Sequence, residues 1–331
     1  MLSRHLPKAS LVLIGAALSL LALPTAPAGA LGTGQIFVSN EGSKEVIVLH
    51  PKDYSTVKSI RTSRRPRDMH FNNDHTLLYV ACADDDIIDV IDVARLIVID
   101  HIPTGPSPEM FELSADNTLL YVSNEENSSV QVISIADKVI LHEIGTGAEP
   151  EGIAISEDGK TIYATSEIAD MVHVIDPETE VTTDNIVVGT RPRRFILTPE
   201  ELWVTDELSS DVSVINRKTN TVTSVLHFAP PGFRPVDVTP VGITMTKDFQ
   251  TAFVTLGHAN HVAFVDIPSK TIKKYVLTGS RPWGVDLSKD EKTLFVANGL
   301  SDDVSMVDIA AAKNMKSVPV GRTPHTVVVD D

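Results

Sequence analysis

The sequence predicts an all-β fold, a seven-bladed β-propeller in which every blade is a four-stranded antiparallel sheet. The first observation behind this prediction is a unit of roughly 42 residues that recurs along the chain. The second is that each unit holds short runs rich in Val and Ile, which turn residues separate. Four short antiparallel strands in a repeat of this length are typical of one propeller blade.

Three kinds of residue mark equivalent positions in the repeat. A proline precedes the first strand, an aromatic residue lies in the second strand, and a mostly polar residue ends the third. The prolines are Pro66, Pro108, Pro150, Pro192, Pro240, Pro282 and Pro324; the aromatic residues are Phe37, Tyr79, Tyr121, Tyr163, Trp203, Phe253 and Phe295; the third set is His50, Asp92, Ser134, Asp176, Asn216, Asp266 and Asp308. Each marker occurs seven times, so each predicts seven blades independently.

The chain begins and ends within a repeat. Its first strands, at 36–40, 46–50 and 55–60, have no preceding first strand, whereas residues 325–330 form a first strand with nothing after it. We expect these two parts to pair and close the ring, because closure leaves only short strand edges. Residues 31–331 are therefore expected to form one domain. Removal of residues 324–331 is expected to collapse its thermal stability.

The residues before position 31 predict a cleaved secretory signal peptide, residues 1–30. Arg4, His5 and Lys8 precede an apolar run at 11–23, and Ala28-Gly29-Ala30 is a small-residue cleavage site. The apolar run is too short to span a bilayer as a permanent helix. We therefore expect export, with the periplasm as the location.

The composition narrows the classes of partner. With 44 acidic against 28 basic residues, the formal net charge is −16, which repels nucleic acid and anionic membranes. No other stretch is long enough to span a bilayer, so membrane insertion is not expected. Cys82 is the only cysteine, so no disulfide is expected, and its position at a strand end predicts a small buried residue.

Propeller geometry places the residues beside each marker proline at one mouth of the central channel, because the first strand of each blade is innermost. Positions that the fold needs are filled alike in all repeats, but these positions carry charges of both signs, an indole and an imidazole. The candidate ligand- or partner-binding residues are Arg65, Arg67, Glu109, Glu149, Glu151, Arg191, Arg193, Arg281, Trp283 and His325. The residues after the second strands, Glu41, Glu125, Glu167 and Glu207, are expected at the same mouth.

Three interpretations of this mouth stay open. Clustered arginines beside a Trp suit a small carboxylate-bearing, planar or aromatic ligand. Alternatively, Arg and Glu neutralise each other in a network of exposed pairs, each worth about 0–1 kcal/mol. On that basis Arg67→Ala with Arg193→Ala is expected to abolish binding while the fold persists. The third interpretation, catalysis by Glu109 and Glu151, is the least favoured, because nearby arginines are expected to keep both carboxyls ionised.

Other features carry weaker predictions. The fifth repeat gains eight residues within 227–240, including Phe228 and Phe233, and we expect this insertion to form a partial lid over the mouth. The acidic runs at 84–86 and 302–303 lack the spacing of a calcium loop and are interpreted as solvated loops. His258 and His261 are interpreted as surface residues. No catalytic or metal-ligating residue and no cofactor is assigned.

Short motifs resemble a known repeat family. IFVSN at 36–40, LYVSN at 120–124 and LFVAN at 294–298 resemble the YVTN β-propeller repeat. RRPRDMHF, AEPEGIAISEDGKT and TRPRRF, in this order, are similar to seven-repeat propellers associated with PQQ-dependent alcohol catabolism. The resemblance covers nearly all of the chain after residue 30. It implies an accessory periplasmic protein with quinoprotein oxidation or ABC transport components as partners, and it supplies no catalytic residues.

Three functional hypotheses follow. The first is a non-enzymatic periplasmic binding or scaffolding propeller that serves a PQQ-dependent alcohol oxidation and transport system. The second is a lactonase-type hydrolase, by analogy of fold alone. The third is a periplasmic carrier that binds a metal or cofactor at the mouth.

Overall fold

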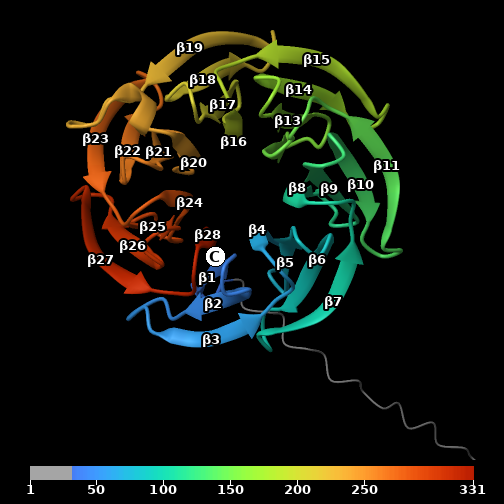
Figure 1. The fold of residues 1–331 in the computed structure, drawn as a ribbon, viewed down its shortest axis with the longest axis horizontal. Coiled ribbons are helices and arrows are strands. Elements are labelled where there is room, and N and C mark those ends of the chain that lie inside the picture. Colours follow the sequence, from blue (N-terminus) through green and yellow to red (C-terminus); the bar gives the residue numbers. More distant parts are fainter. Residues whose placement is uncertain (1–31) are drawn as a thin grey trace, which may run out of the picture. The chain divides into compact units, whose positions relative to one another are not determined.

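The computed structural model describes residues 32–331, so the signal peptide predicted at 1–30 lies outside the described residues. The described residues form seven four-stranded antiparallel sheets arranged as blades around a central axis (Figure 1). The predicted seven-bladed β-propeller is therefore confirmed. One 3-10 turn, η1 (Pro235–Asp237), is the only helical segment between residues 32 and 331. No helix there is long and apolar enough to cross a membrane.

Blades 2 to 7 follow one another along the chain, each built from its innermost strand outward, whereas blade 1 takes its innermost strand from the end of the chain. Blades 1 to 3 consist of β28 (Pro324–Val329), β1 (Ile36–Asn40), β2 (Glu45–Leu49) and β3 (Thr56–Arg61); β4 (Pro66–Phe71), β5 (Leu77–Cys82), β6 (Ile87–Asp92) and β7 (Ile97–Pro103); and β8 (Pro108–Leu113), β9 (Leu119–Asn124), β10 (Ser129–Ser134) and β11 (Val139–Gly145). Blades 4 and 5 consist of β12 (Ile153–Ile155), β13 (Ile162–Ser166), β14 (Met171–Asp176) and β15 (Val181–Val187); and β16 (Pro192–Leu197), β17 (Glu201–Asp206), β18 (Asp211–Asn216) and β19 (Thr221–His227). Blades 6 and 7 consist of β20 (Pro240–Met245), β21 (Thr251–Leu256), β22 (His261–Asp266) and β23 (Thr271–Leu277); and β24 (Pro282–Leu287), β25 (Thr293–Asn298), β26 (Asp303–Asp308) and β27 (Lys313–Pro319).

Burial explains why the second and third strands are the most apolar. In β1 every residue is buried, whereas the outermost strand β3 buries one residue of six. The aromatic markers Phe37, Trp203 and Phe253 are fully buried. β-Branched and aromatic side chains fit such pleated surfaces, so local preference and burial agree.

The core lies between the blades. The described residues form seven buried apolar clusters, one at each interface between neighbouring blades. Between blades 2 and 3, for example, Tyr79 and Ile88 pack with Phe111 and Leu120. Each blade is therefore stabilised by its two neighbours, as in other repeat folds.

The ring closes as predicted, through pairing of the two chain ends. β28 pairs antiparallel with β1, with Ile36 opposite Val329 and Val38 opposite Val327. The Thr33 backbone N–H donates to the Asp330 carboxylate at 2.9 Å. The ends of the described chain meet at one face, which we call the terminal face; the opposite face, where the marker prolines begin the innermost strands, is the proline face.

Candidate functional site

A repeated backbone motif builds the rim of the channel at the proline face. The residue before each marker proline has a positive φ, for example 56° at Arg65, 60° at Arg191 and 58° at Arg281. Its carbonyl accepts the N–H of the residue that follows the second strand of the same blade, as between Arg191 and Glu207 at 3.0 Å. This bond holds the residue before each proline next to the residue that follows the second strand. The two sets of residues that the sequence assigns to the mouth therefore lie side by side.

Acidic loop residues hold this motif in place. The Asp86 carboxylate accepts the Ser107 backbone N–H at 3.0 Å, and the Asp302 carboxylate accepts that of Thr323 at 2.8 Å. In the same loop as Asp86, the Asp85 carboxylate pairs with Arg64 at 2.6 Å. These aspartates therefore have structural partners. No group of three or more His, Cys, Asp or Glu suited to a metal ion occurs within residues 32–331.

The channel opens at the proline face into a cavity of about 430 Å³, which we call the proline mouth. Nine of the ten candidate residues line it: Arg65, Arg67, Glu109, Glu151, Arg191, Arg193, Arg281, Trp283 and His325. Glu41, Glu125 and Glu167 line it too. Glu149, the tenth candidate, does not line the cavity. Its backbone carbonyl accepts the Glu167 N–H at 3.0 Å.

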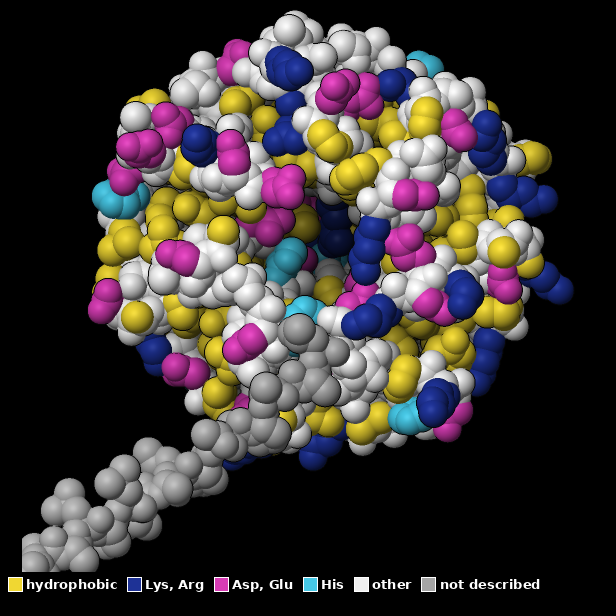
Figure 2. All heavy atoms as spheres, turned by 180° about the vertical axis from the view of Figure 1, so that it is seen from behind, with side chains coloured by type: hydrophobic (Ala, Val, Ile, Leu, Met, Phe, Trp, Pro, Cys, Tyr) yellow, Lys and Arg dark blue, Asp and Glu magenta, His cyan; other side chains and the backbone are white. Residues whose placement is uncertain are grey.

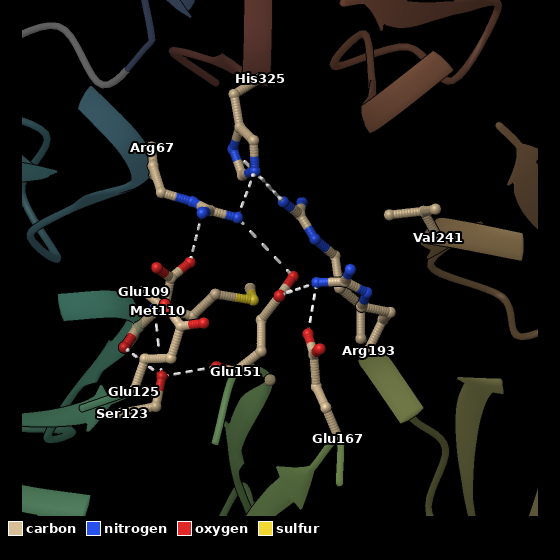
Figure 3. A network of polar contacts seen from close by, with 12 residues as sticks. Arg67, Glu109, Met110, Ser123, Glu125, Glu151, Glu167, Arg193, Val241 and His325 are labelled. Atoms are coloured by element: carbon tan, nitrogen blue, oxygen red, sulfur yellow. Dashed lines mark hydrogen bonds and ion pairs between the residues drawn. The ribbon is translucent and has the colours of Figure 1, made fainter. Parts of the chain in front are cut away.

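Arg193, on the innermost strand β16, is the centre of an ion-pair network (Figure 3). Its guanidinium contacts the carboxylates of Glu151 and Glu167, and its Nε donates to Glu207 at 2.7 Å. Gly152 allows the inner strands of blades 4 and 5 to approach this closely, because a Cβ there would overlap the Arg193 carbonyl oxygen. Arg193 of blade 5 and Glu151 of blade 4 therefore form an ion pair between neighbouring blades.

Arg67 is a second centre on the opposite wall. Its Nη1 lies 2.6 Å from Glu109, its Nε 3.5 Å from Glu41, and its Nη2 3.9 Å from Glu151. Glu151 thus links the two arginines, which Figure 3 shows pointing toward one another across the mouth.

The network is buried, and here the expectation of exposed pairs is wrong. Arg67 and Arg193 are 6% and 5% exposed, and Glu109 and Glu151 are 2% and 4% exposed. The inner strands converge on the axis, so the first residue after each proline lies inside the channel wall. Removing one partner of a buried pair leaves an uncompensated charge. The expectation that Arg67→Ala with Arg193→Ala leaves the fold intact is therefore withdrawn.

Burial and pairing with arginine give the buried glutamates different pKa values. Burial opposes ionisation of Glu151, but Arg193 and Arg67 hold its pKa well below the usual range. Burial and the adjacent Glu151 carboxylate raise the pKa of Glu167 to about 9. Burial also raises the pKa of Glu109 to about 7, against the attraction of Arg67. These directions support the expectation of an ionised carboxyl for Glu151, whereas a pKa of about 7 leaves Glu109 only about half ionised at neutral pH.

An aromatic wall faces the network. The Arg281 guanidinium lies 4.8 Å from the centre of the Trp283 ring, and the His325 ring lies 5.3 Å from it. Arg281 also donates to Glu207 at 2.8 Å. Burial and the cationic Arg67 lower the pKa of His325 well below its usual value, so the ring is neutral. It therefore accepts from Arg67 Nη2 at 3.1 Å.

Two arginines remain accessible at the entrance. The side chains of Arg65 and Arg191 are 33% and 40% exposed. Arg65 approaches its carboxylate partners no closer than 3.5 Å, whereas Arg191 donates to Glu167 at 2.6 Å. An arriving anion can therefore contact guanidinium groups without breaking the buried pairs.

Two residues near the channel were not among the candidates. His258 lines the proline mouth although it is exposed, as expected of a surface histidine. The sequence could have indicated His258, because it lies two residues after the second strand β21. Glu41, Glu125 and Glu167 occupy the neighbouring position in other blades. Arg194 lies deeper and donates to His325 at 3.3 Å. The sequence marks it only as the residue after Arg193.

The insertion in the fifth repeat does not form the expected lid. None of its residues lines the proline mouth. Phe228 is buried in the cluster between blades 5 and 6, and Phe233 packs against that cluster. The apolar side chains are thus used in the interface between blades. Cys82 is buried as predicted, and burial raises the pKa of its thiol well above the usual value.

Asp206, which ends β17, yields a prediction about stability. It is fully buried, and burial raises its pKa to about 8, with the neighbouring Asp211 carboxylate adding to the shift. Because the folded pKa exceeds the unfolded one, of about 3.9, Asp206 destabilises the fold progressively as the pH rises from about 4 to 8. Asn40, Asn124 and Asn298 stand at the equivalent position of other blades.

Asp206→Asn is expected to raise the free energy of unfolding by about 1–3 kcal/mol at pH 8, with little change at pH 4. The amide oxygen can still accept from Ser213, which donates at 2.7 Å, and the amide N–H can face Asp211. Denaturant unfolding at both pH values measures this difference. An equal gain at both, or a loss at pH 8, would contradict it.

The fold and this mouth define the chain as a β-propeller with a charged cavity at one end of its axis. It belongs to the choice-of-anchor I domain family, whose model matches residues 126–320. No curated protein sequence matches the chain.

Solved structures with the same fold include proteins of different activities. Periplasmic gluconolactonase PpgL of Pseudomonas aeruginosa is 22% identical, with a TM-score of 0.75 over 89% of this chain and 98% of that one. Kuenenia stuttgartiensis hydrazine synthase is 20% identical, with a TM-score of 0.75 over 89% and 99%. Dihydro-heme d1 dehydrogenase NirN is 13% identical, with a TM-score of 0.70 over 94% and 78%. At these identities the matches show the fold alone.

Proposed function

We propose that this protein is a non-enzymatic binding propeller that holds a small carboxylate-bearing, planar or aromatic molecule at the proline mouth. The observation that carries the proposal is the stack of Arg281 on Trp283 beside the accessible guanidinium groups of Arg65 and Arg191.

The cationic side chains of the lining favour a planar anion. Five arginines and no lysine line the mouth. A guanidinium binds a carboxylate through two parallel hydrogen bonds and stacks on flat rings, whereas an ammonium group does neither. The indole of Trp283 supplies an apolar surface for a ring, and a cavity of about 430 Å³ is in the usual range for small ligands.

The lining favours binding over covalent catalysis. Within the described part of the chain, residues 32–331, no serine or cysteine lines the proline mouth. Thr323 lines it, but its backbone N–H bonds to Asp302 and no histidine contacts its hydroxyl. A nucleophile with an adjacent general base, which acyl transfer requires, is thus not supported by the described residues.

The setting we propose is the periplasm, in a PQQ-dependent alcohol oxidation or transport system. The sequence resemblance supports this setting, and so does the name of the similar gluconolactonase, which calls that protein periplasmic. Quinoprotein oxidation or ABC transport components are the proposed partners. The mouth would then present an oxidised carboxylate product, or an analogue of it, to such a component.

The test uses Trp fluorescence with benzoate as the probe. Trp203 is fully buried and Trp283 lines the mouth, so the two can be distinguished by a Trp203→Phe background. Benzoate is expected to change the Trp283 emission, and Arg65→Gln with Arg191→Gln is expected to weaken binding at least about tenfold. The buried carboxylates that these two arginines contact keep a second partner, Arg67 or Arg193, so the fold should persist.

The matched control is Arg61→Gln with Arg95→Gln, which removes the same charge from exposed positions away from the mouth. It should leave the benzoate affinity unchanged. Equal weakening in both double variants would mean that general electrostatics, and not the mouth, is responsible. Unchanged affinity in the Arg65 and Arg191 variant would remove the proline mouth as the site.

A lactonase-type hydrolase is the second candidate, and one observation favours it. Glu167, with a pKa of about 9, lies beside the ionised Glu151, which is the arrangement of a general acid with a general base. Gluconolactone hydrolysis followed at pH 7 decides between the two. Hydrolysis above the spontaneous rate that Glu151→Gln abolishes would establish the enzyme; the binding proposal predicts no such excess.

A further inference from the structure

The opposite end of the channel holds a second cavity, of about 510 Å³, at the terminal face. We call it the terminal mouth. Figure 2 shows this hollowed face, with basic, acidic and histidine side chains gathered around its centre. Its lining is mostly apolar and includes Phe71, Met110, Phe195 and Met245. The proline mouth, in contrast, is lined chiefly by Arg and Glu.

Arg194 lines this cavity, and no carboxylate of the described residues contacts its guanidinium. It is 7% exposed, its Nε has no hydrogen-bond partner, and its Nη2 reaches the neutral His325 ring at 3.3 Å. No carboxylate within residues 32–331 lies within 4.0 Å of its guanidinium, whereas Arg67 and Arg193 have several. Asp68 and Glu151, which lie beyond that distance, oppose the effect of burial but leave the pKa of Arg194 below its ordinary value, so the buried guanidinium is incompletely compensated.

Two carboxyls in the same cavity form no ion pair within 4.0 Å, although the nearby His70, whose pKa is raised to about 9, partly offsets the effect of burial on both. Glu112 of β8 and Asp286 of β24 line the terminal mouth, and within residues 32–331 neither has Lys, Arg or His within 4.0 Å. Asp286 accepts only backbone N–H groups, from Leu287 at 2.8 Å and Val329 at 2.9 Å. Burial raises the pKa of both carboxyls to about 7. A cation placed beside them would restore their ionised form.

The other charged pair of the cavity is satisfied internally. Asp68 accepts from His70 at 3.0 Å and from the Phe111 backbone N–H at 3.2 Å. Among residues 32–331, the groups of this cavity that form no ion pair within 4.0 Å are therefore one guanidinium and two carboxyls, on blades 5, 3 and 7. A simple anion would leave the carboxyls without a partner, and a simple cation would leave Arg194 without one.

We propose that the terminal mouth binds a small zwitterion of the α-amino-acid class with an apolar side chain. Its carboxylate pairs with Arg194, its ammonium group pairs with Glu112 or Asp286, and its side chain packs against the apolar lining around Met110 and Phe195. Methionine and phenylalanine side chains adapt to such a group without polar competition. This site is separate from the proline mouth and does not depend on the function proposed there.

Calorimetric titration of the protein with three matched compounds tests the proposal. L-leucine carries both charges, isocaproate lacks the ammonium group, and L-leucinamide lacks the carboxylate. L-leucine is expected to bind, and each analogue to bind at least about tenfold more weakly. Equal affinity of either analogue would overturn the proposal. So would the absence of binding by L-leucine, L-methionine and L-phenylalanine up to about 10 mM.

Variants then assign the site. Arg194→Gln is expected to weaken L-leucine binding at least about tenfold without lowering the melting temperature, because it removes an unpaired buried charge. Glu112→Gln or Asp286→Asn is expected to weaken it by a similar factor. Arg95→Gln, at an exposed position, is the matched control. Unchanged affinity in Arg194→Gln would overturn the proposal; if that variant fails to fold, the comparison of the three compounds on the unaltered protein decides alone.

Discussion

Removal of residues 324–331 is expected to abolish the cooperative thermal unfolding of this protein. The deletion takes away β28, the innermost strand of blade 1, and exposes the backbone edge of β1. Val327 and Val329 are lost from the cluster that also holds Ile36, Val38 and Phe295 of blades 1 and 7. Two of the seven interfaces between blades are weakened at once, and the ring opens.

The size of the effect follows from the repeat architecture. Each blade is stabilised chiefly by its neighbours, so an open ring leaves two blades with a bare face. The buried Val327 and Val329 contribute about 1.5–3 kcal/mol each, and the half-buried Val328 adds to this, so the loss is a large fraction of the stability of a typical domain. We expect far-UV circular dichroism of the truncated chain to lose its sharp thermal transition.

A circular permutant separates closure from the mere loss of a terminus. Gly32 and Asp331 are in contact, so the two ends can be joined and new ends opened in the exposed turn between Lys218 and Thr219. This permutant keeps β28 paired with β1 and should retain a sharp transition. If the truncated chain melts like the full one, ring closure by β28 is not what stabilises the fold.

Arg193→Met is expected to lower the free energy of unfolding by about 3–5 kcal/mol at pH 8. The substitution keeps the aliphatic bulk but leaves the buried Glu151 and Glu207, together with Glu167, without their common partner. For a domain of this size such a loss lowers the melting temperature by several degrees. Arg95→Met, at an exposed ion pair, should change stability by less than about 1 kcal/mol.

The pH dependence of this loss has a definite sign. In the native protein the folded pKa of Glu151 is depressed, so its ionised form stabilises the fold above the unfolded value of about 4.3. Without Arg193, burial dominates and raises the folded pKa, so the carboxyl destabilises the fold increasingly above that pH. The deficit of Arg193→Met should therefore shrink as the pH falls from 8 toward 4. A deficit independent of pH would show that lost packing, and not unpaired charge, is its cause.

The repeat explains why the fold could be predicted from the sequence. Marker residues at equivalent positions, from Phe37 to Phe295, occupy buried positions because each blade repeats the same contacts. Ring closure was predictable because the first repeat, at 36–60, lacks a first strand and residues 325–330 supply one. The insertion near Phe228 was not, because its apolar residues fit equally a lid or a cluster between blades.

The location of the candidate site was predicted from the sequence, but the burial of its residues was not. The residues around each proline were assigned to one mouth, and nine of ten line it. Arg194 and the terminal mouth were not predicted, because the second residue after each marker proline was not expected to face the channel. Burial depends on the distance of each strand from the axis, which a repeat pattern does not contain.

The sequence by itself determined the number of blades, the order of strands and the face where the charged residues gather, because these depend on positions within a repeat. Only the tertiary structure decided which charges are paired. Arg67 meets Glu151, and Arg281 meets Glu207, across blades that are far apart in the chain. The same closure leaves Arg194 with no carboxylate of residues 32–331 within 4.0 Å of its guanidinium. Contacts across a ring depend on its radius and on how the side chains fill its centre, and those are properties of all seven blades together.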